Sequence, residues 1–316
     1  MNIFESKDIV KQYSNFIALY KVSVSIKEGS VFGILGPNGA GKTSFIRIMN
    51  QITAPDEGKL FYKGQPLLAS HISEFGYLPE ERGLYKKMKV GEQVLYLAML
   101  RGLKRSEALK KLKYWFEKFE IQAWWGKKAE ELSKGMQQKI QFIISVLHEP
   151  KFLIFDEPFS GFDPINVNIL KQEILKMKDN GATIILSTHN MASVEELCDD
   201  IVLINKAKTV LSGSVNEIRK QYKDNTFTVT FSGFVNLIEA SLRHQYQILS
   251  HDEKDGLHII KFKLLDNSVT TNMLLTGLLP IGNIVSFNEI LPTMNDIFIK
   301  VVEGNYNNVV ADVAHN

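Results

Sequence analysis

One octapeptide of the sequence combines the residue types that bind phosphate. It reads Gly-Pro-Asn-Gly-Ala-Gly-Lys-Thr and fits the pattern G-x-x-x-x-G-K-[ST]. Glycines let backbone N–H groups curve around an anion, the lysine adds a full positive charge, and the threonine hydroxyl can ligate Mg²⁺. This P-loop is therefore expected to bind the phosphates of a nucleotide through Gly36, Pro37, Asn38, Gly39, Ala40, Gly41, Lys42, Thr43 and the adjacent Ser44.

Two carboxylates follow an apolar run much further along the chain. Phe152 to Phe155 contains no polar residue, and Asp156 and Glu157 come directly after it. In P-loop nucleotidases the first acid of such a pair holds Mg²⁺, usually through water, and the second can act as a general base on the attacking water. We expect Asp156 and Thr43 to bind the metal and Glu157 to be catalytic. A solvated acidic loop is the alternative, which the P-loop in the same chain disfavours.

The segments around these motifs predict the sheet that positions them. Val22 to Ile26 alternates in polarity, as a half-buried strand does, and Val31 to Leu35 leads straight into the P-loop. The later apolar runs are nearly continuous, as expected for strands buried on both faces of a parallel sheet. An α/β fold is therefore predicted, with strands at 152–155 and 183–186 and helices at 43–50, 165–178 and 191–198.

A helical region is expected between about residues 88 and 150. Leu109, Leu112, Phe116 and Phe119 fall on one face of a helix, for which Ser106 is a plausible N-cap. The same helix carries a cluster of basic residues: Lys104, Arg105, Lys110, Lys111 and Lys113. The favoured interpretation is the solvated side of an amphipathic helix, and the alternative is a surface that faces anionic lipid or a membrane partner.

A second, smaller domain is expected from the polar sequence Lys223-Asp224-Asn225 onward. The pattern predicts a large nucleotide-binding domain at 1–222, an α+β domain at 223–304 and a disordered tail at 305–316. The order β-α-β-β-α-β in the smaller domain is that of a ferredoxin-like fold. Its expected elements are strands 226–231, 246–250, 257–265 and 283–288 and helices 234–244 and 270–279, with a last helix at 293–303.

A further motif, together with its place between the predicted elements, indicates a particular family of P-loop proteins. Leu132-Ser133-Lys134-Gly135-Met136 lies between the helical region and the strand that ends at Asp156. With this motif in place, residues 3 to 220 resemble the nucleotide-binding domain of ABC transporters, whose signature is LSGGQ. The resemblance implies a P-loop NTPase fold with a RecA-like parallel core, a small antiparallel section and a helical subdomain. It also implies that Ser133 and Gly135 contact the γ-phosphate of ATP bound to the opposite subunit.

Three more positions match this family. The resemblance implies that Asp163, in Ser160-Gly161-Phe162-Asp163, belongs to the D-loop that crosses the dimer interface, and that His189 is the switch histidine near the γ-phosphate. It also places Tyr13 where the family has an aromatic residue that stacks on adenine. Phe16 is the substitute candidate for that stacking position.

Two departures from the family pattern affect the site. Glu80 stands where the family has its Q-loop glutamine, and Lys134 and Met136 replace Gly and Gln of the signature. A carboxylate near the γ-phosphate adds like-charge repulsion unless Mg²⁺ or another cation offsets it. We expect Glu80 to keep a catalytic and metal-side role in coupling the nucleotide to a membrane subunit. Lys134 could attract phosphate or could face solvent.

Composition narrows the classes of protein that the chain could belong to. The 316 residues are 45% hydrophobic and 23% charged, with a net charge of +2, which is too small for a general nucleic-acid footprint. The single cysteine, Cys198, suits a reducing compartment. No stretch approaches the roughly 20 apolar residues of a membrane-spanning helix, and the start of the sequence lacks a secretion signal. A membrane function therefore requires a partner.

The resemblance extends to a subfamily. The loop around Glu80, the Leu-Ser-Lys-Gly-Met signature and the added C-terminal domain look like the ABC-2-type, sodium-exporter-like (NatA-like) ATPases. This implies ATP and Mg²⁺ as ligands, an ABC-2-type membrane permease as partner, and a homodimer or a paralogue dimer at the cytoplasmic face of the membrane. Export is favoured over import. The alternatives are a soluble ABC ATPase that acts on nucleic acid or ribosomes, and a regulatory nucleotide binder without turnover.

Overall fold

The computed structural model describes residues 1–81, 83–233, 246–266, 270–279 and 282–313. The chain forms two compact units, one made of Met1–Val215 with Val301–Asn316 and the other of Asn216–Lys300. The sequence pattern suggested a boundary at residue 223, seven residues after the point where the two units divide. Each unit has its own buried core.

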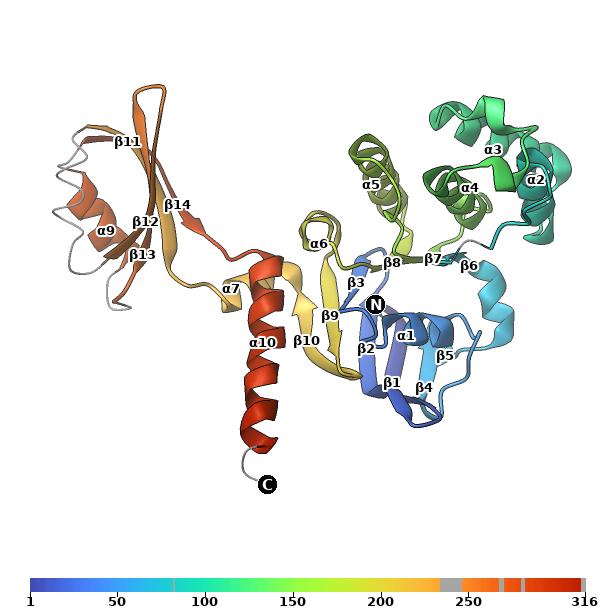
Figure 1. The fold of residues 1–316 in the computed structure, drawn as a ribbon, viewed down its shortest axis with the longest axis horizontal. Helices are drawn as coiled ribbons and strands as arrows, with labels where there is room; N and C mark the ends of the chain where they lie inside the picture. The colour runs from blue at the N-terminus through green and yellow to red at the C-terminus, as the bar shows by residue number, and fades with distance from the viewer. Residues whose placement is uncertain (82, 234–245, 267–269, 280–281, 314–316) are drawn as a thin grey trace. The chain divides into compact units, whose positions relative to one another are not determined.

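A six-stranded sheet forms the centre of the first unit, in the order β10-β9-β3-β8-β7-β6 (Figure 1). All neighbours are parallel except β10, which is antiparallel to β9. Every residue of β3, β7 and β8 is buried, which explains the continuous apolar runs at 31–35, 152–155 and 184–186. The strands are β3 Val31–Leu35, β6 Phe75–Leu78, β7 Phe152–Asp156, β8 Thr183–Ser187, β9 Asp200–Asn205 and β10 Lys208–Ser214.

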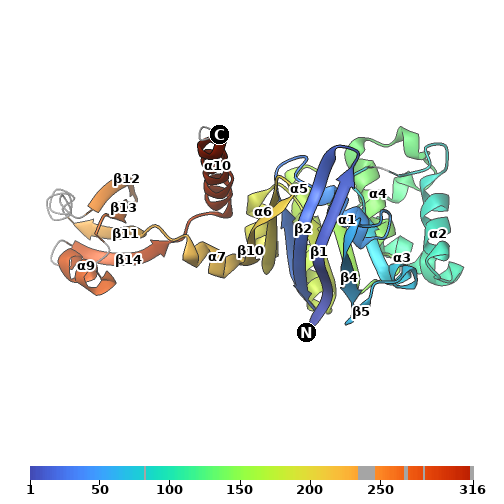
Figure 2. The same cartoon turned by 90° about the horizontal axis from the view of Figure 1, so that it is seen from below.

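A four-stranded antiparallel sheet packs beside the central one. Its order is β2-β1-β4-β5, and Figure 2 shows β1 and β2 as two long neighbouring strands. The alternation at 22–26 predicted only the end of β2, and β1 was not predicted. The bounds are β1 Asn2–Tyr13, β2 Phe16–Lys27, β4 Glu57–Tyr62 and β5 Gln65–Pro66.

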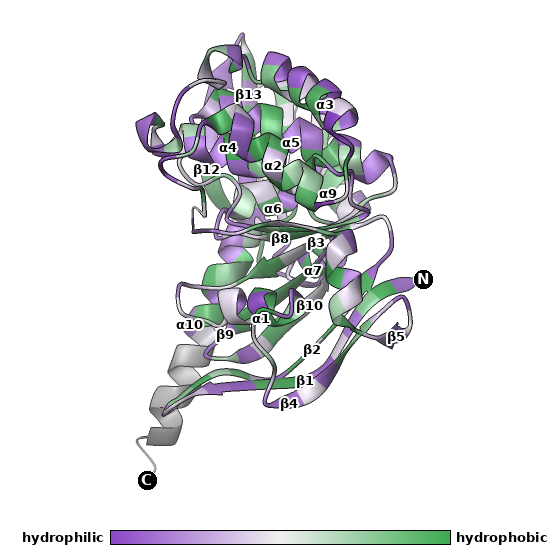
Figure 3. Ribbon diagram, turned by 90° about the vertical axis from the view of Figure 1, so that its right-hand side faces the viewer, coloured by the Kyte–Doolittle hydropathy of each residue, from purple (hydrophilic) through white to green (hydrophobic). Residues whose placement is uncertain are grey.

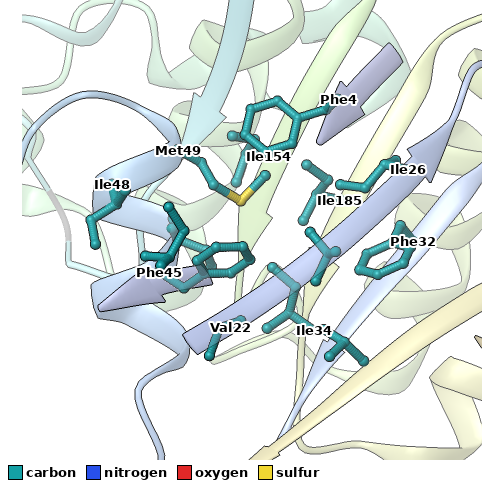
Figure 4. Packing of buried hydrophobic residues seen from close by; sticks show 14 of the residues in the cluster. Phe4, Val22, Ile26, Phe32, Ile34, Phe45, Ile48, Met49, Ile154 and Ile185 are labelled. Atoms are coloured by element: carbon teal, nitrogen blue, oxygen red, sulfur yellow. The ribbon is translucent and has the colours of Figure 1, made fainter. Parts of the chain in front are cut away.

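The core of the first unit lies between these sheets and helix α1 (Lys42–Met49). Figure 4 shows Phe45 and Met49 of α1 in one cluster with Phe4 of β1 and Ile154 and Ile185 of the central sheet. These side chains are fully or almost fully buried, and burying each contributes roughly 1.5–3 kcal/mol. The helix that begins at the P-loop is therefore fixed to both sheets.

Helices cover the other face of the central sheet, and α2, α3 and α4 lie together at one side of the unit (Figures 1 and 2). The helix α3 begins at Arg105, and its N-cap is Lys104, which makes no side-chain capping bond, so the prediction of a Ser106 cap is wrong. Gly102, at φ +89°, turns the chain early enough that Ser106 already lies in the first helical turn. The helices are α2 Val90–Leu100, α3 Arg105–Lys118, α4 Lys134–Val146, α5 Pro164–Asp179 and α6 Met191–Leu197, with 3-10 turns η1 Ala69–Glu74, η2 Gln122–Trp124 and η3 Ala129–Glu131.

Hydropathy follows these layers. The central strands are mostly green in Figure 3, whereas α3 carries purple, hydrophilic stripes next to green ones. Ala108, Leu112 and Phe116 form the buried side of α3, as expected for an amphipathic helix, but Leu109 is 36% exposed. Within the described ranges, the structure contains no helix long and apolar enough to span a bilayer.

The second unit is a four-stranded antiparallel sheet in the order β12-β13-β11-β14. Numbered within the unit, this order is 2-3-1-4, which agrees with the predicted ferredoxin-like arrangement. The expected helix at 234–244 lies outside the described residues. The unit comprises α7 Val215–Gln221, β11 Thr226–Gly233, β12 Tyr246–Lys254, β13 Leu257–Leu264, α9 Thr271–Leu278 and β14 Gly282–Ile290.

The last helix is longer than the sequence pattern suggested. We expected a disordered tail at 305–316, but α10 runs from Met294 to Val313. No proline follows Pro292, so the backbone has no element that must end the helix after Gly304. Thr293 starts α10, since its hydroxyl accepts a hydrogen bond from the Asp296 N–H at 3.1 Å.

Candidate nucleotide site

The P-loop connects β3 to α1 in a conformation that requires glycine. Gly36 has a φ of +150°, and a Cβ there would lie 2.2 Å from the carbonyl oxygen of Ile204. Gly41 has a φ of +114°, and a Cβ there would lie 2.2 Å from the carbonyl oxygen of Ala18. The glycines thus let the loop pass close to neighbouring backbone while the N-terminus of α1 faces the loop.

A pocket of about 310 Å³ lies at the carboxyl ends of β3, β6 and β7. Because these parallel strands end at the same edge of the sheet, residues far apart in sequence meet there. Nine predicted site residues line it, together with Phe16, the substitute candidate for the stacking position. The lining consists of Phe16, Asn38, Gly39, Gly41, Lys42, Thr43, Ser44, Glu80, Asp156 and Glu157.

Lys42 is buried at the first turn of α1 and points back at the P-loop. Its Nζ donates to the carbonyl oxygens of Gly36 at 2.7 Å and Pro37 at 3.1 Å. Burial lowers the pKa of Lys42, and the carboxylates of Glu157, Asp156 and Glu80 oppose that shift. The ammonium is thus placed next to three acids, in the position of a group that neutralises phosphate.

Asp156 is the most deeply buried acid of the pocket, with 1% of its surface exposed. Neither carboxylate oxygen has a hydrogen-bond partner among the described residues. Burial raises the pKa of Asp156 to about 6; the nearby Ser187 hydroxyl lowers this pKa, whereas the negative charges of Glu80 and Glu157 raise it further. A buried, unpartnered carboxylate of this kind is suited to a cation ligand.

Glu157 and His189 form a hydrogen-bonded pair. His189 Nδ1 lies 2.9 Å from Glu157 Oε1, and because an ionised carboxylate only accepts, Nδ1 must carry the proton. The backbone of Glu157 has a φ of +50°, which is unusual for a side-chain-bearing residue. That conformation is held by hydrogen bonds from Glu157 N–H to Ser187 O at 2.9 Å and from Ser160 N–H to Glu157 O at 3.1 Å.

The signature residues do not line this pocket. Ser133 caps α4, where its hydroxyl accepts a hydrogen bond from Met136 N–H at 3.3 Å. Asp163 caps α5 by accepting one from Asn166 N–H at 3.0 Å, which lowers the pKa of its carboxyl. Gly135 lies against the D-loop, since a Cβ there would be 2.5 Å from the carbonyl oxygen of Gly161. The expected D-loop and signature are therefore in contact within one chain.

The two aromatic candidates flank the turn between β1 and β2, where Tyr13 pairs with Phe16. Phe16 lines the pocket and is 58% exposed, whereas Tyr13 is not among the lining residues. The Tyr13 ring instead lies 5.4 Å from the ammonium of Lys11. The residue that the sequence offered only as a substitute is thus the one that faces the pocket.

Glu80 lines the pocket from the end of β6 and is itself exposed. Its charge raises the pKa of both Lys42 and Asp156. The next residue, Glu81, connects two helices: its carboxylate lies 4.0 Å from Arg47 of α1, and its carbonyl accepts from Gln141 of α4. The Gln141 contact could not be predicted from the sequence, because an isolated glutamine on a helix has no partner-specific pattern.

The fold and this pocket define a P-loop nucleotidase. A family model described as ABC transporter matches residues 19–160, and one described as ATP-binding protein DrrA1-3-like, C-terminal domain, matches residues 213–302. The uncharacterized ABC transporter ATP-binding protein YhaQ of Bacillus subtilis is 38% identical over 300 residues, which are 94% of this chain and 98% of YhaQ. The ABC transporter ATP-binding protein NatA of the same organism is 30% identical and covers 72% of this chain and 92% of its own.

A solved structure of an ABC transporter ATP-binding subunit is also similar. It has a TM-score of 0.65 and 30% identity, and the match covers 70% of this chain and 93% of that chain. The chain belongs to the family of ABC transporter ATP-binding proteins, and it is an ATPase of that family. The relatives give no support to the alternative of a nucleic-acid ATPase.

Proposed function

We propose that this ATPase drives export through a separate ABC-2-type membrane permease, to which it binds at the cytoplasmic face of the membrane. Similarity to ATP-binding proteins named for transport, among them NatA and the bacitracin transport protein BcrA of Enterococcus faecalis, supports this proposal. The C-terminal match to a DrrA-like domain supports the same subfamily. We propose an ATP-binding domain at 1–222, which contains the helical subdomain at about 88–150, and a C-terminal α+β domain at 223–304.

Two copies of the chain, or one copy and a paralogue, are proposed to close on two ATP molecules. The observation that carries this proposal is the division of the expected site: Lys42, Asp156 and Glu157 line one pocket, whereas Ser133, Gly135 and Asp163 do not. The latter three lie at or next to helix N-termini, which attract anions. A second copy would bring these helix ends to the phosphate held by the first.

Mg²⁺ fits the pocket as a cofactor. Asp156 offers two buried, unpartnered oxygens, and Thr43 lies in the same pocket. Among the described residues there is no cluster of three or more metal-binding side chains, which suits a cation that takes its other ligands from phosphate and water. Bound there, Mg²⁺ would offset the charge of the triphosphate beside three carboxylates.

Glu157 is proposed as the general base. Its Oε1 is engaged by His189, so the other oxygen remains for the attacking water, and the water proton passes to this carboxylate. The hydrogen bond also orients the His189 ring so that Nε2 faces away from Glu157; with a proton already on Nδ1, Nε2 donates to the γ-phosphate only in the doubly protonated imidazolium form. Lys42 leaves the carbonyls of Gly36 and Pro37 to bind phosphate.

The direct test is the variant Glu157→Gln. It keeps the shape of the site but removes the base, so we expect ATP turnover to fall at least about 100-fold and a dimer to accumulate with Mg²⁺ and ATP. Light scattering after size exclusion measures the dimer. The double variant Lys42→Met/Glu157→Gln is the control and should stay monomeric. A single variant that remains monomeric at saturating ATP would refute the two-copy scheme.

Glu80 is proposed to couple ATP turnover to the permease. It lies at the edge of the pocket, at the start of the loop toward Tyr85. Glu80→Gln restores the family residue and removes one negative charge near Lys42 and Asp156. We expect a changed basal turnover and a changed stimulation by the co-purified permease. If both quantities match the wild type, Glu80 has no coupling role.

A further inference from the structure

Gln93 of α2 binds the loop that carries Glu80 with both atoms of its side-chain amide. Its Oε1 accepts from Tyr85 N–H at 2.8 Å, and its Nε2 lies 3.3 Å from the Tyr85 carbonyl oxygen, to which it donates. Gln93 is fully buried. A fully buried amide satisfied on both sides by one backbone residue holds that residue against α2.

Gln141 of α4 holds the same loop at a second point. Its Nε2 donates to the carbonyl oxygen of Glu81 at 3.3 Å, and the residue is 6% exposed. Gln141 lies eight positions after Ser133, which is about two helical turns from the signature. The helix that begins at the signature is therefore bonded directly to the residue next to Glu80.

Backbone hydrogen bonds continue this connection beyond Tyr85. The segment 86–91 pairs with the segment 125–130, and the second of these leads directly into Leu132 and Ser133. The bonds are Glu130 N–H to Lys86 O at 3.0 Å, Ala129 N–H to Met88 O at 3.1 Å, Val90 N–H to Lys127 O at 2.9 Å and Gly91 N–H to Trp125 O at 3.0 Å. Gly91 is required at this crossing, since a Cβ there would lie 2.3 Å from the Trp125 ring.

From these contacts we infer that Gln93 and Gln141 are positioning residues that make the Glu80 loop and the signature helix move as one body. This inference rests on the proposed role of Glu80 and Ser133 in one catalytic cycle. A shift of Glu80 on nucleotide binding then displaces α4 through Gln141, and a shift of α4 displaces Glu80. Without the two amides, the chain connection, the paired segments and the packing of α4 against α2 and β6 would remain to transmit the movement.

The test compares Gln93→Met and Gln141→Met in the full-length protein. Methionine has nearly the shape of glutamine but makes no such hydrogen bond, so packing is kept and the loop bonds are lost. Hydrogen exchange of the Tyr85 amide should accelerate by about fivefold to tenfold in Gln93→Met, because one modest hydrogen bond protects it. We expect kcat to fall by a similar factor while KM for ATP stays within about twofold, because the P-loop is untouched.

Gln51→Met is the matched control. Gln51 also donates one side-chain bond to a backbone carbonyl, that of Leu67 at 2.8 Å, and Leu67 is not part of the loop between Glu80 and Tyr85. The Gln51→Met variant should leave kcat and the hydrogen exchange of the Tyr85 amide as in the wild type. If Gln93→Met does not fold, Gln141→Met carries the test, because it removes only one side-chain bond.

Two outcomes separate this inference from the proposed function. If the folded methionine variants keep wild-type kcat and wild-type exchange around Tyr85, the positioning role is wrong although the ATPase scheme stands. If the Glu157→Gln chain never dimerises, the proposed function fails and the loop bonds lose their catalytic meaning. Faster exchange without any change in kcat also overturns the inference, because it would show a purely structural role.

Discussion

The two halves of the expected ATP site differ in how completely their polar groups are hydrogen-bonded within the same chain. Around the P-loop, Lys42 and Asp156 are buried charges, one bonded only to loop carbonyls and the other without a hydrogen-bond partner among the described residues. Around the signature, Ser133 and Asp163 already cap helices. The first half therefore needs a ligand, whereas the second is complete and offers helix N-termini to one.

The largest effect that can break this comparison is expected at Lys42. Lys42→Met removes the only cation in the pocket lining that the structure describes, so we expect nucleotide affinity and turnover to fall about 100-fold or more. Fluorescent-nucleotide titration of the monomer measures the affinity, and phosphate release measures the turnover. A Lys42→Met monomer that binds ATP as well as the wild type would show that the pocket is not the nucleotide site.

Gly135→Ala tests the other half. The added Cβ would meet the Gly161 carbonyl oxygen at 2.5 Å and displace the signature from the D-loop. Because this half makes no part of the P-loop pocket, monomer affinity for ATP should remain within about twofold while turnover falls about tenfold or more. The measurements are those used for Lys42→Met, so the two variants can be compared directly.

Mixing these two chains sharpens the comparison further. A dimer of one Lys42→Met chain and one Gly135→Ala chain has one site in which both halves are intact. Random pairing of equal amounts would give about half of the dimers this composition, hence about a quarter of the wild-type activity. If the ATPase activity of the mixture does not exceed the sum of the two separate variants, the idea of a site shared between two copies is contradicted.

The two halves also differ in the pH dependence of their carboxylates. The pKa of Asp156 is raised from 3.8 to about 6, so its ionised form opposes folding above pH 6 and the cost disappears below about pH 4. Asp156→Asn should therefore stabilise the nucleotide-free protein by up to about 3 kcal/mol at pH 7.5, and not at pH 3.5. Denaturant unfolding at the two pH values, without Mg²⁺, measures the difference.

Asp163→Asn is the control for that experiment, with the opposite sign. Capping lowers the pKa of Asp163, so its charged form supports the fold above its ordinary pKa of 3.8 and this support is lost as pH falls. The variant should give no gain at pH 7.5. Equal behaviour of the two variants would mean that burial in the pocket does not distinguish Asp156.

The sequence predicted the P-loop half better than its surroundings. The glycines, Lys42 and the acids after β7 form local patterns, and the parallel order of the strands follows from their apolar runs. β1 was missed because Glu5, Lys7 and Asp8 interrupt its apolar residues. The strand is instead held by its pairing with β2 and β4, which the local sequence does not reveal. The Ser106 cap was wrong because the Gly102 turn, not the capping residue, determines where α3 begins.

Contacts between distant segments were beyond the sequence pattern. Gln93 and Gln141 have ordinary polar side chains on helices, and only the fold shows that Gln141 reaches the backbone of Glu81 and Gln93 that of Tyr85. The family resemblance placed His189 near the γ-phosphate, but its hydrogen bond to Glu157, 32 residues earlier in the chain, was not predicted. Local motifs thus predicted which residues bind phosphate, and the tertiary structure was needed to relate them to the loop and the signature helix.

The smallest predicted effect concerns the aromatic residue at the pocket. Phe16 lines it, while Tyr13 lies under the Lys11 ammonium, so Phe16→Ala should raise KM for ATP about fivefold and Tyr13→Ala less than twofold. Phe16→Trp is a matched variant that keeps a stacking surface and should restore the affinity. Titration with ATP and with inorganic triphosphate separates the causes, because only the nucleotide has a base to stack. A Phe16→Ala loss shared by triphosphate, or a larger loss in Tyr13→Ala, would assign the adenine to another surface and leave Phe16 as part of the pocket wall.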